Sequence, residues 1–169
     1  LCLDLGASTG GFTDCLLQRG ARRVIAVDVG VNQLDSRLRG DDRVDAREGV
    51  NARHLTAADF TEAPSLLVAD LSFIGLDKVL PHVCALLDFP EMLVLVKPQF
   101  EVGPGVVQKG IVRDDAARDA AVARVSAMVA DLGYAMDVPF ACPVKGARGN
   151  QEFLLHARRT ITAAGGAGA

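Results

Sequence analysis

The sequence predicts one doubly wound α/β domain, a parallel sheet with helices on both faces. Apolar runs alternate with segments of helical periodicity along almost the whole chain, a pattern typical of βαβ units. Within each run, successive residues are apolar, as in strands that are buried on both faces of a parallel sheet. A chain of 169 residues, 50% of them hydrophobic, is long enough to bury the core of one such domain.

The apolar runs predict seven strands, of which the third is the weakest. These strands are expected at residues 1–5, 24–28, 44–47, 65–70, 92–97, 134–142 and 152–157. We find no internal repeat and no boundary of a second domain.

Apolar residues at helical spacing predict helices at 9–19, 33–38, 76–87 and 114–132. The last of these is the clearest, because Asp114 or Asp115 can cap its start and Gly133 can end it. The stretch 98–112 is expected to be a loop. Loops of this length often form lids or contact substrates.

The composition excludes several classes of protein. The hydrophobic content excludes long disorder, and no apolar run is long enough for a transmembrane helix. The 18 basic and 21 acidic residues give a net charge of −3, whereas a domain that binds nucleic acid by itself usually carries a basic excess. Any affinity for RNA or DNA is therefore expected from a local patch or from another part of the protein.

The cysteines and histidines predict neither disulfides nor a metal site. The four cysteines form no CxxC pair and lie at irregular spacings, so we interpret them as small core residues. The three histidines show no metal-ligand spacing. Because no signal peptide is recognisable either, we expect a cytoplasmic protein.

The strongest chemical signal is the turn between the first strand and the first helix, Asp4-Leu5-Gly6-Ala7-Ser8-Thr9-Gly10-Gly11-Phe12. Glycines let a backbone approach a ligand closely, and ligands of open α/β sheets bind beyond the carboxyl ends of the strands. The glycine positions break the GxGxxG fingerprint, which favours a ligand without a pyrophosphate. A plain tight turn is the structural alternative.

Asp28 ends the second predicted strand. A carboxylate at this position can accept hydrogen bonds from both hydroxyls of a ribose, although it can also be a solvated loop acid. Together with the glycine turn, Asp28 indicates a cofactor that contains adenosine. NAD and S-adenosylmethionine (SAM) both satisfy this pattern.

Three further charged residues stand at strand ends. Asp70 ends the fourth strand, Lys97 ends the fifth and Glu152 starts the last. Because the carboxyl ends of parallel strands meet at one edge of the sheet, we expect Asp70 and Lys97 to face the same crevice. A lysine after an apolar strand is costly to bury unless it is paired, so an acidic partner is expected. A structural ion pair is the alternative to a catalytic role.

Four stretches of the chain, taken in order, resemble the TlyA family of rRNA 2′-O-methyltransferases, also called hemolysin A. They are residues 4–14, 69–74, 96–101 and 149–153. The resemblance covers residues 1–160. It implies the fold of a class I SAM-dependent methyltransferase with an FtsJ-like catalytic domain, in which the last of seven strands is antiparallel.

The resemblance also implies SAM as cofactor and a Lys-Asp-Lys-Glu catalytic set, whose last three members are Asp70, Lys97 and Glu152. Asp28 is expected on the ribose, and the segment 48–51 near the adenine. The implied cofactor residues are Asp4, Gly6, Ala7, Ser8, Thr9, Gly10, Gly11, Phe12, Asp28, Val29, Glu48, Asn51 and Asp70.

In the implied reaction, the methyl group on the sulfonium is already activated, so the enzyme must align a ribose 2′-hydroxyl and manage its proton. Lys97 either takes that proton as a neutral amine or stabilises the developing alkoxide as a cation. Burial favours the neutral amine, whereas nearby carboxylates favour the cation, so both roles stay open.

We expect residues 1–160 to form the methyltransferase domain and the Ala- and Gly-rich residues 161–169 to form a flexible tail. The chain starts inside an apolar run without Met, so we expect a fragment that lacks the first catalytic Lys and the N-terminal RNA-binding domain of the family. The expected partner is ribosomal RNA or a ribosomal subunit, held mostly by that domain, with cytidine as the target. No metal and no membrane partner is expected.

Two sets of residues near the predicted crevice allow two interpretations each. Phe73 and Phe100 are either core residues or platforms on which a base stacks. Basic residues in two loops either contact phosphates or are solvated surface charges: Lys109, Arg113, Lys145 and Arg148.

The sequence disfavours three other functions. The glycine spacing and the lack of a Tyr-xxx-Lys or His–Asp set disfavour an NAD-dependent oxidoreductase. A membrane-active hemolysin is disfavoured because the sequence has no spanning segment and no strongly basic amphipathic helix. A binding module that has lost catalysis is disfavoured by the presence of Asp70, Lys97 and Glu152.

Overall fold

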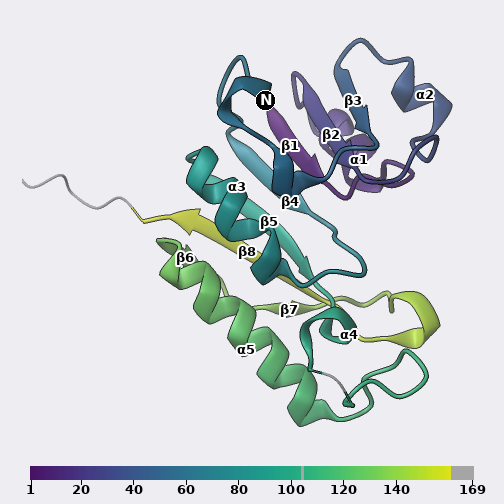
Figure 1. Cartoon of the computed structure of the whole chain (residues 1–169), viewed down its shortest axis with the longest axis vertical. Helices are drawn as coiled ribbons and strands as arrows, with labels where there is room; N and C mark the ends of the chain where they lie inside the picture. Colours follow the sequence, from purple (N-terminus) through teal and green to yellow (C-terminus); the bar gives the residue numbers. More distant parts are fainter. Residues whose placement is uncertain (104, 161–169) are drawn as a thin grey trace, which may run out of the picture.

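A twisted β-sheet of apolar strands forms the centre of the molecule (Figure 1). The computed structural model describes residues 1–103 and 105–160, so the predicted tail lies outside the described residues. The strand order is β3-β2-β1-β4-β5-β8-β6, and β7 also pairs with β8. The strands are β1 (Cys2–Leu5), β2 (Val24–Asp28), β3 (Val44–Glu48), β4 (Leu66–Ala69), β5 (Glu91–Val96), β6 (Tyr134–Met136), β7 (Phe140–Ala141) and β8 (Phe153–Arg159).

Strand β8 runs against the direction of its neighbours in the sheet. Strands β1 to β5 pair in parallel, whereas β8 is antiparallel to β5, β6 and β7. The antiparallel last strand is therefore confirmed. The strand expected at 134–142 is divided into β6 and β7, because Pro139 between them has no amide hydrogen for the ladder. The described residues thus form eight strands instead of seven.

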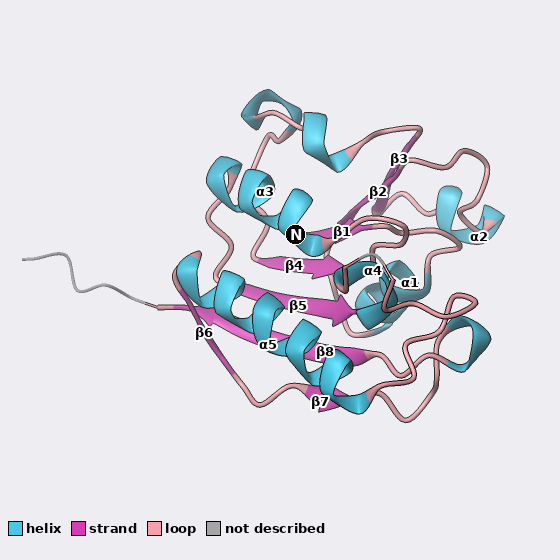
Figure 2. Cartoon of the chain, turned by 60° about the horizontal axis from the view of Figure 1, so that its bottom comes forward, coloured by secondary structure: helices cyan, strands magenta, loops and turns pink. Residues whose placement is uncertain are grey.

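Helices cover both faces of the sheet, as predicted (Figure 2). On one face, Leu17 of α1 (Gly11–Gln18) and Leu38 of α2 (Ser36–Arg39) pack with Cys2 and Val24 of the sheet. On the other face, the residues that pack on Leu3 and Leu5 come from α3 (Leu80–Leu86) and α5 (Asp115–Asp131). Within the part of the chain that the structure describes, no helix is long and apolar enough to cross a membrane.

Capping and proline signals explain where α5 and the helical segment at 76–87 begin and end. The side chain of Asp114 caps α5 by accepting a hydrogen bond from the Ala116 amide at 3.0 Å, and Gly133 follows the end of this helix with a φ of 88°, as predicted. The helix expected at 76–87 consists of a 3₁₀ turn, η3 (Leu76–Lys78), and then α3, in which Pro81 is tolerated near the start.

The stretch 98–112, expected to be a loop throughout, begins with the short helix α4 (Pro98–Glu101). Pro98 occupies its first turn, where the missing amide hydrogen has no intrahelical partner anyway and the fixed φ suits a helix. Further 3₁₀ turns are η1 (Ala52–His54), η2 (Ala57–Asp59) and η4 (Ala147–Gly149). Helix α4 begins directly beyond β5, at the edge of the sheet where the parallel strands end (Figure 2).

Candidate active site

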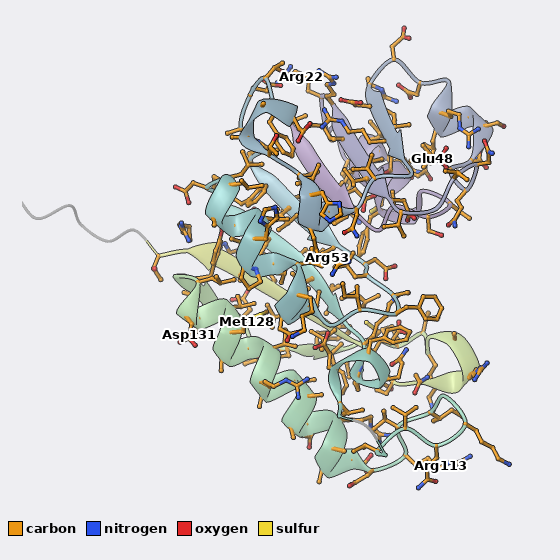
Figure 3. All side chains as sticks on the ribbon, viewed as in Figure 1. Arg22, Glu48, Arg53, Arg113, Met128 and Asp131 are labelled. Atoms are coloured by element: carbon orange, nitrogen blue, oxygen red, sulfur yellow. The ribbon has the colours of Figure 1, made fainter. Side chains whose placement is uncertain are left out.

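A cavity of about 450 Å³ opens at the carboxyl ends of the parallel strands. Its walls come from the segments that follow β1, β2, β3 and β4, which is where the fold class predicts a ligand. Figure 3 shows the side chains of this region, including the labelled Arg53. The lining residues are Gly6, Ser8, Val27, Asp28, Val29, Gln33, Val50, Asn51, Ala52, Arg53, Asp70, Leu71, Ser72, Phe73, Ile74 and Val79.

Several predicted site residues line this cavity, and others lie behind it. The predicted residues in its wall are Gly6, Ser8, Asp28, Val29, Asn51 and Asp70. The predicted residues outside the wall are Asp4, Ala7, Thr9, Gly10, Gly11, Phe12, Glu48, Lys97 and Glu152.

The glycine turn has a conformation that other residues adopt only with strain. Gly6 has a φ of 79°, and a Cβ atom there would overlap the backbone carbonyl of Asp70. Gly10 has a φ of 99° and precedes α1, and a Cβ atom there would overlap the Leu38 side chain. The absence of side chains therefore lets the turn after β1 approach the end of β4, and lets the start of α1 approach α2.

Asp28 presents a carboxylate whose orientation is set by backbone amides. Its Oδ2 accepts a hydrogen bond from the Ser8 amide at 2.8 Å, and its Oδ1 accepts one from the Gly30 amide at 2.7 Å. Each carboxylate oxygen has a second lone pair, so both can still accept a hydroxyl group. The geometry suits the pair of hydroxyls of a ribose.

Asp4 is a fully buried acid behind the glycine turn. Its Oδ2 accepts a hydrogen bond from Thr13 Oγ1 at 2.6 Å, while its Oδ1 has no partner among the described residues. Burial, supported by the nearby Asp70 and Asp28 carboxylates, raises the pKa of Asp4 to about 6. Three acids thus gather at one edge of the cavity, and this arrangement favours a ligand that carries positive charge and hydroxyl donors.

Glu48 and Asn51 follow β3 but have different surroundings. The Asn51 side chain accepts a hydrogen bond from the Arg53 amide at 3.1 Å within the cavity wall. The Glu48 carboxylate accepts from the amides of Gln33 and Leu34 at 2.6 and 3.0 Å, and these bonds lower its pKa. Glu48 therefore supports the loop that contributes Gln33 to the wall, and its contact with a cofactor stays a prediction.

Lys97 and Asp70 form the expected ion pair. Lys97 Nζ lies 2.5 Å from Asp70 Oδ1 and donates a hydrogen bond to Ser72 Oγ at 2.8 Å. The Lys97 side chain is only 12% exposed, so the acidic partner compensates for the burial of its charge. The pair connects the ends of two neighbouring parallel strands, β4 and β5, beside the cavity.

Glu152 lies just before β8 and is 8% exposed. Its Oε1 accepts a hydrogen bond from Gln99 Nε2 at 3.3 Å, and its carboxylate packs against the backbone of Gly146. Among the described residues, it forms no hydrogen bond or ion pair with Lys97 or Asp70. Burial raises the pKa of the Cys142 thiol, and the charges of Glu152 and Asp70 add to this effect, so both carboxylates lie around one thiol.

Phe73 is a surface residue at the mouth of the cavity, not a core residue. It is 91% exposed, has a φ of 66°, and its ring centroid lies 5.2 Å from that of Phe100 at an interplanar angle of 51°. A left-handed backbone is unfavourable for a bulky residue, and such strain is typical of functional sites. The exposed ring can receive a planar group.

The basic residues predicted to contact phosphates are exposed at the surface: Lys109, Arg113, Lys145 and Arg148. The loops that carry Lys109 and Arg148 meet, because Arg148 Nη1 donates to the Lys109 carbonyl at 3.2 Å.

His82 contacts the Leu55 carbonyl at 2.9 Å. Within residues 1–103 and 105–160, no cluster of His, Cys, Asp and Glu is arranged to hold a metal ion.

Sequence reasoning missed part of the cavity wall. The missed residues are Val27, Gln33, Ala52, Arg53, Leu71, Ser72, Ile74 and Val79, whereas Val50 lies in the segment predicted near the adenine. Most of them stand directly after β3 or β4. Extending each parallel strand by a few residues beyond its carboxyl end would have found them.

The strand order, with an antiparallel β8 between β5 and β6, and the glycine turn opposite Asp28 define a class I methyltransferase. The chain matches the model of the FtsJ-like methyltransferase family over residues 1–159. It therefore belongs to the FtsJ-like methyltransferase family. The match gives no support to an oxidoreductase.

Two curated relatives and one solved structure illustrate the similarity. "Hemolysin A" of Brachyspira hyodysenteriae is 46% identical over 159 residues, which are 92% of this chain and 66% of the relative. The "16S/23S rRNA (cytidine-2′-O)-methyltransferase TlyA" of Mycobacterium tuberculosis is 48% identical over 160 residues, 93% of this chain and 59% of the relative. The solved structure of "a putative hemolysin from Lactococcus lactis" has a TM-score of 0.90 and 43% identity, covering 94% of this chain and 77% of the other. The chain thus spans 59% to 66% of the length of these two curated relatives.

Proposed function

We propose that this chain is the catalytic domain of an enzyme that transfers a methyl group from SAM to a ribose 2′-hydroxyl of ribosomal RNA, with cytidine as the target nucleoside. The observation that carries the proposal is the half-buried Lys97–Asp70 pair beside a cavity that presents Asp28 to a ribose. Relatives named for rRNA cytidine-2′-O-methylation support the choice of substrate.

The charges of the cavity favour SAM over NAD. SAM carries a cationic sulfonium and an amino group, whereas NAD carries an anionic pyrophosphate. Asp4, Asp28 and Asp70 gather at one edge, so they attract the first and repel the second. Gly6, Ser8 and Val29 would line the cofactor, while Asp28 would accept hydrogen bonds from its ribose. SAM supplies an activated methyl group.

The contacts of Lys97 favour an electrostatic role. Lys97 Nζ lies 2.5 Å from Asp70 Oδ1, as in an ion pair, and donates to the hydroxyl of Ser72, which fixes its direction. An ammonium can stabilise a developing alkoxide but cannot accept its proton. Lys97 would therefore hold the 2′-oxygen of the ribose, and the 2′-hydroxyl proton would pass to another acceptor. Glu152 is the buried carboxylate available at this edge for that purpose.

The substrate side of the proposal uses the exposed aromatic ring and the basic loops. Phe73 offers a face on which the target base can stack. Lys109 and Arg148 lie on two loops that meet near the catalytic edge, where they can contact phosphates. Because the chain carries a net charge of −3, most affinity for the ribosomal subunit would come from an N-terminal RNA-binding domain, for which the greater length of the relatives leaves room. An rRNA substrate would place the protein in the cytoplasm.

The first test is calorimetric titration of the chain with S-adenosylhomocysteine, with NADH titrated in parallel. We expect binding of the first and none of the second. The second test is transfer of a labelled methyl group from SAM to isolated ribosomal subunits by the full-length protein that contains this chain, followed by mapping of the 2′-O-methylated nucleotide. Binding of NADH alone would overturn the choice of cofactor, and label on a base instead of a ribose would overturn the choice of acceptor.

A further inference from the structure

Helix α4 links Lys97 to the loop that follows β4. Lys97 is the residue before this helix and contacts Asp70, as described above. At the other end of the helix, the buried Glu101 accepts a hydrogen bond from the Leu76 amide at 2.9 Å. One short helix thus fixes both ends of the segment that contains the cavity residues after β4.

The second residue of α4, Gln99, reaches a different segment. Its Nε2 donates to Glu152 Oε1 at 3.3 Å, across 53 positions of the sequence. Among the described residues, this amide is the only side chain that donates a hydrogen bond to the Glu152 carboxylate. Because buried carboxylates require donors, Gln99 is the residue that sets the orientation of this acid.

The oxygen of the Gln99 amide indicates that this side chain does more than fill space. The Nε2 atom faces Glu152, and this leaves Oε1 buried without a partner in the described part of the chain. An apolar residue of similar size, such as Met, would avoid the unsatisfied oxygen. A buried polar side chain that leaves its oxygen without a partner indicates that its donor group is used in function.

We propose that Gln99 is a positioning residue that holds Glu152 at the catalytic edge, two positions after Lys97 on the same turn. Gln99 does not line the cavity, so it acts through Glu152 and not on the cofactor. The inference rests on the proposed function, in which Glu152 is a candidate catalytic residue. It predicts separate effects on turnover, on cofactor affinity and on stability.

The decisive variant is Gln99→Met, which keeps the length of the side chain and removes the donor. We expect methyl transfer to fall by about tenfold or more, with the KM for SAM unchanged within about twofold. The melting temperature should change little, because the variant removes the unsatisfied Gln99 oxygen but also removes the donor to Glu152, and these two effects oppose each other. A purely structural role predicts the opposite, a loss of turnover that follows a loss of stability.

A matched control exists on α1. Gln18 also donates to a carboxylate, Asp14 Oδ2, at 2.7 Å, but on an exposed surface. Gln18→Met should keep both turnover and stability. Turnover of Gln99→Met within about twofold of the unmodified protein would overturn the proposal.

Gln99→Glu tests the positioning role through the pH dependence of turnover, which a purely structural role would not change. It places a second carboxylate beside Glu152, so turnover should fall near neutral pH. At lower pH one of the two acids takes up a proton and can donate again, so activity relative to the unmodified protein should recover. A pH profile that is lowered uniformly would contradict the positioning role.

A measurement that does not depend on methyl transfer distinguishes this inference from the proposed function. In NMR spectra of the labelled chain, the Gln99 side-chain amide should shift in Glu152→Gln, whereas the Gln18 amide should not. An unchanged Gln99 signal would overturn the contact itself. If the contact is present but the unmodified protein methylates no RNA, the proposed function fails and the positioning role fails with it.

Discussion

The two sides of the candidate site are held together in different ways. On the cofactor side, formed by the glycine turn and Asp28, backbone groups supply the contacts: the Gly6 amide donates to the Val27 carbonyl at 2.8 Å, and backbone amides hold Asp28. On the catalytic side, formed by residues 97–101 and 142–152, side chains supply them. Asn150 is an example, since its Nδ2 donates to the Gly110 carbonyl at 2.8 Å.

This difference indicates how each side can fail. Backbone contacts between β1 and β2 survive most substitutions, so the cofactor side depends on the fold itself and on a few glycines. Side-chain contacts between distant segments can be lost one at a time while the sheet stays intact. We therefore expect substitutions on the catalytic side to abolish transfer without abolishing cofactor binding.

Lys97→Met should give the largest effect and the clearest separation. We expect methyl transfer to fall by about 10²- to 10⁴-fold, because the cation that stabilises the alkoxide is gone. The affinity for S-adenosylhomocysteine, measured by calorimetry, should change by no more than a few-fold. Lys78→Met, at an exposed lysine in η3, serves as the control. Near-normal transfer by Lys97→Met would remove Lys97 from the mechanism.

Gly6→Ala should break the cofactor side and the fold together. The positive φ and the overlap with the Asp70 carbonyl together should cost about 2–4 kcal/mol of stability, measured by urea unfolding. Binding of S-adenosylhomocysteine should be lost as well. Gly11→Ala is the stability control, because a Cβ atom there meets nothing within 4 Å. Equal stabilities of the two variants would argue against the close approach at Gly6.

Asp28→Ala should weaken the cofactor side without unfolding it. Loss of the hydrogen bonds to a ribose should reduce the affinity for S-adenosylhomocysteine by about 10- to 100-fold. Circular dichroism should show an unchanged fold, and Asp131→Ala at the exposed end of α5 should leave the affinity unchanged. An unaltered affinity of Asp28→Ala would refute the ribose contact.

Asp4→Asn should give the smallest effect, and one that depends on pH. Burial raises the pKa of Asp4 from its ordinary value of 3.8 to about 6 in the folded chain. The folded state therefore binds the proton more tightly, and stability falls as the pH rises through this window. At pH 7 the neutral Asn should stabilise the fold by about 1–2 kcal/mol. Urea unfolding at pH 4 and pH 7 checks this. A difference between the two proteins that is the same at both pH values would contradict the buried charge.

Local patterns were sufficient for the sheet and for the cofactor side. The apolar runs predicted the parallel strands, and the glycine turn and Asp28 both line the cavity as a doubly wound sheet requires. The same topological rule predicted that Asp70 and Lys97 would meet, because β4 and β5 are neighbours. These features follow from residues that are close in the sequence or at the ends of adjacent strands.

Short or strained segments were beyond such patterns. Helix α4 has only four residues, too few to show helical periodicity, and Pro98 was its one local signal. The division of the strand expected at 134–142 had a local signal in Pro139, but the separate pairing of each part with β8 did not. The exposure of Phe73 depends on a left-handed backbone that its own sequence does not favour.

The sequence by itself determined the α/β class, the edge of the sheet that holds the cavity and the acids and glycines that face it. Hydrophobic period and turn chemistry are properties of neighbouring residues, which is why one chain suffices to recognise them. Only the tertiary structure decided that Gln99 meets Glu152, that Glu48 supports a loop and that Asp4 keeps an oxygen without a partner. Such contacts join segments far apart in the chain, and their geometry is set by the packing of the whole domain.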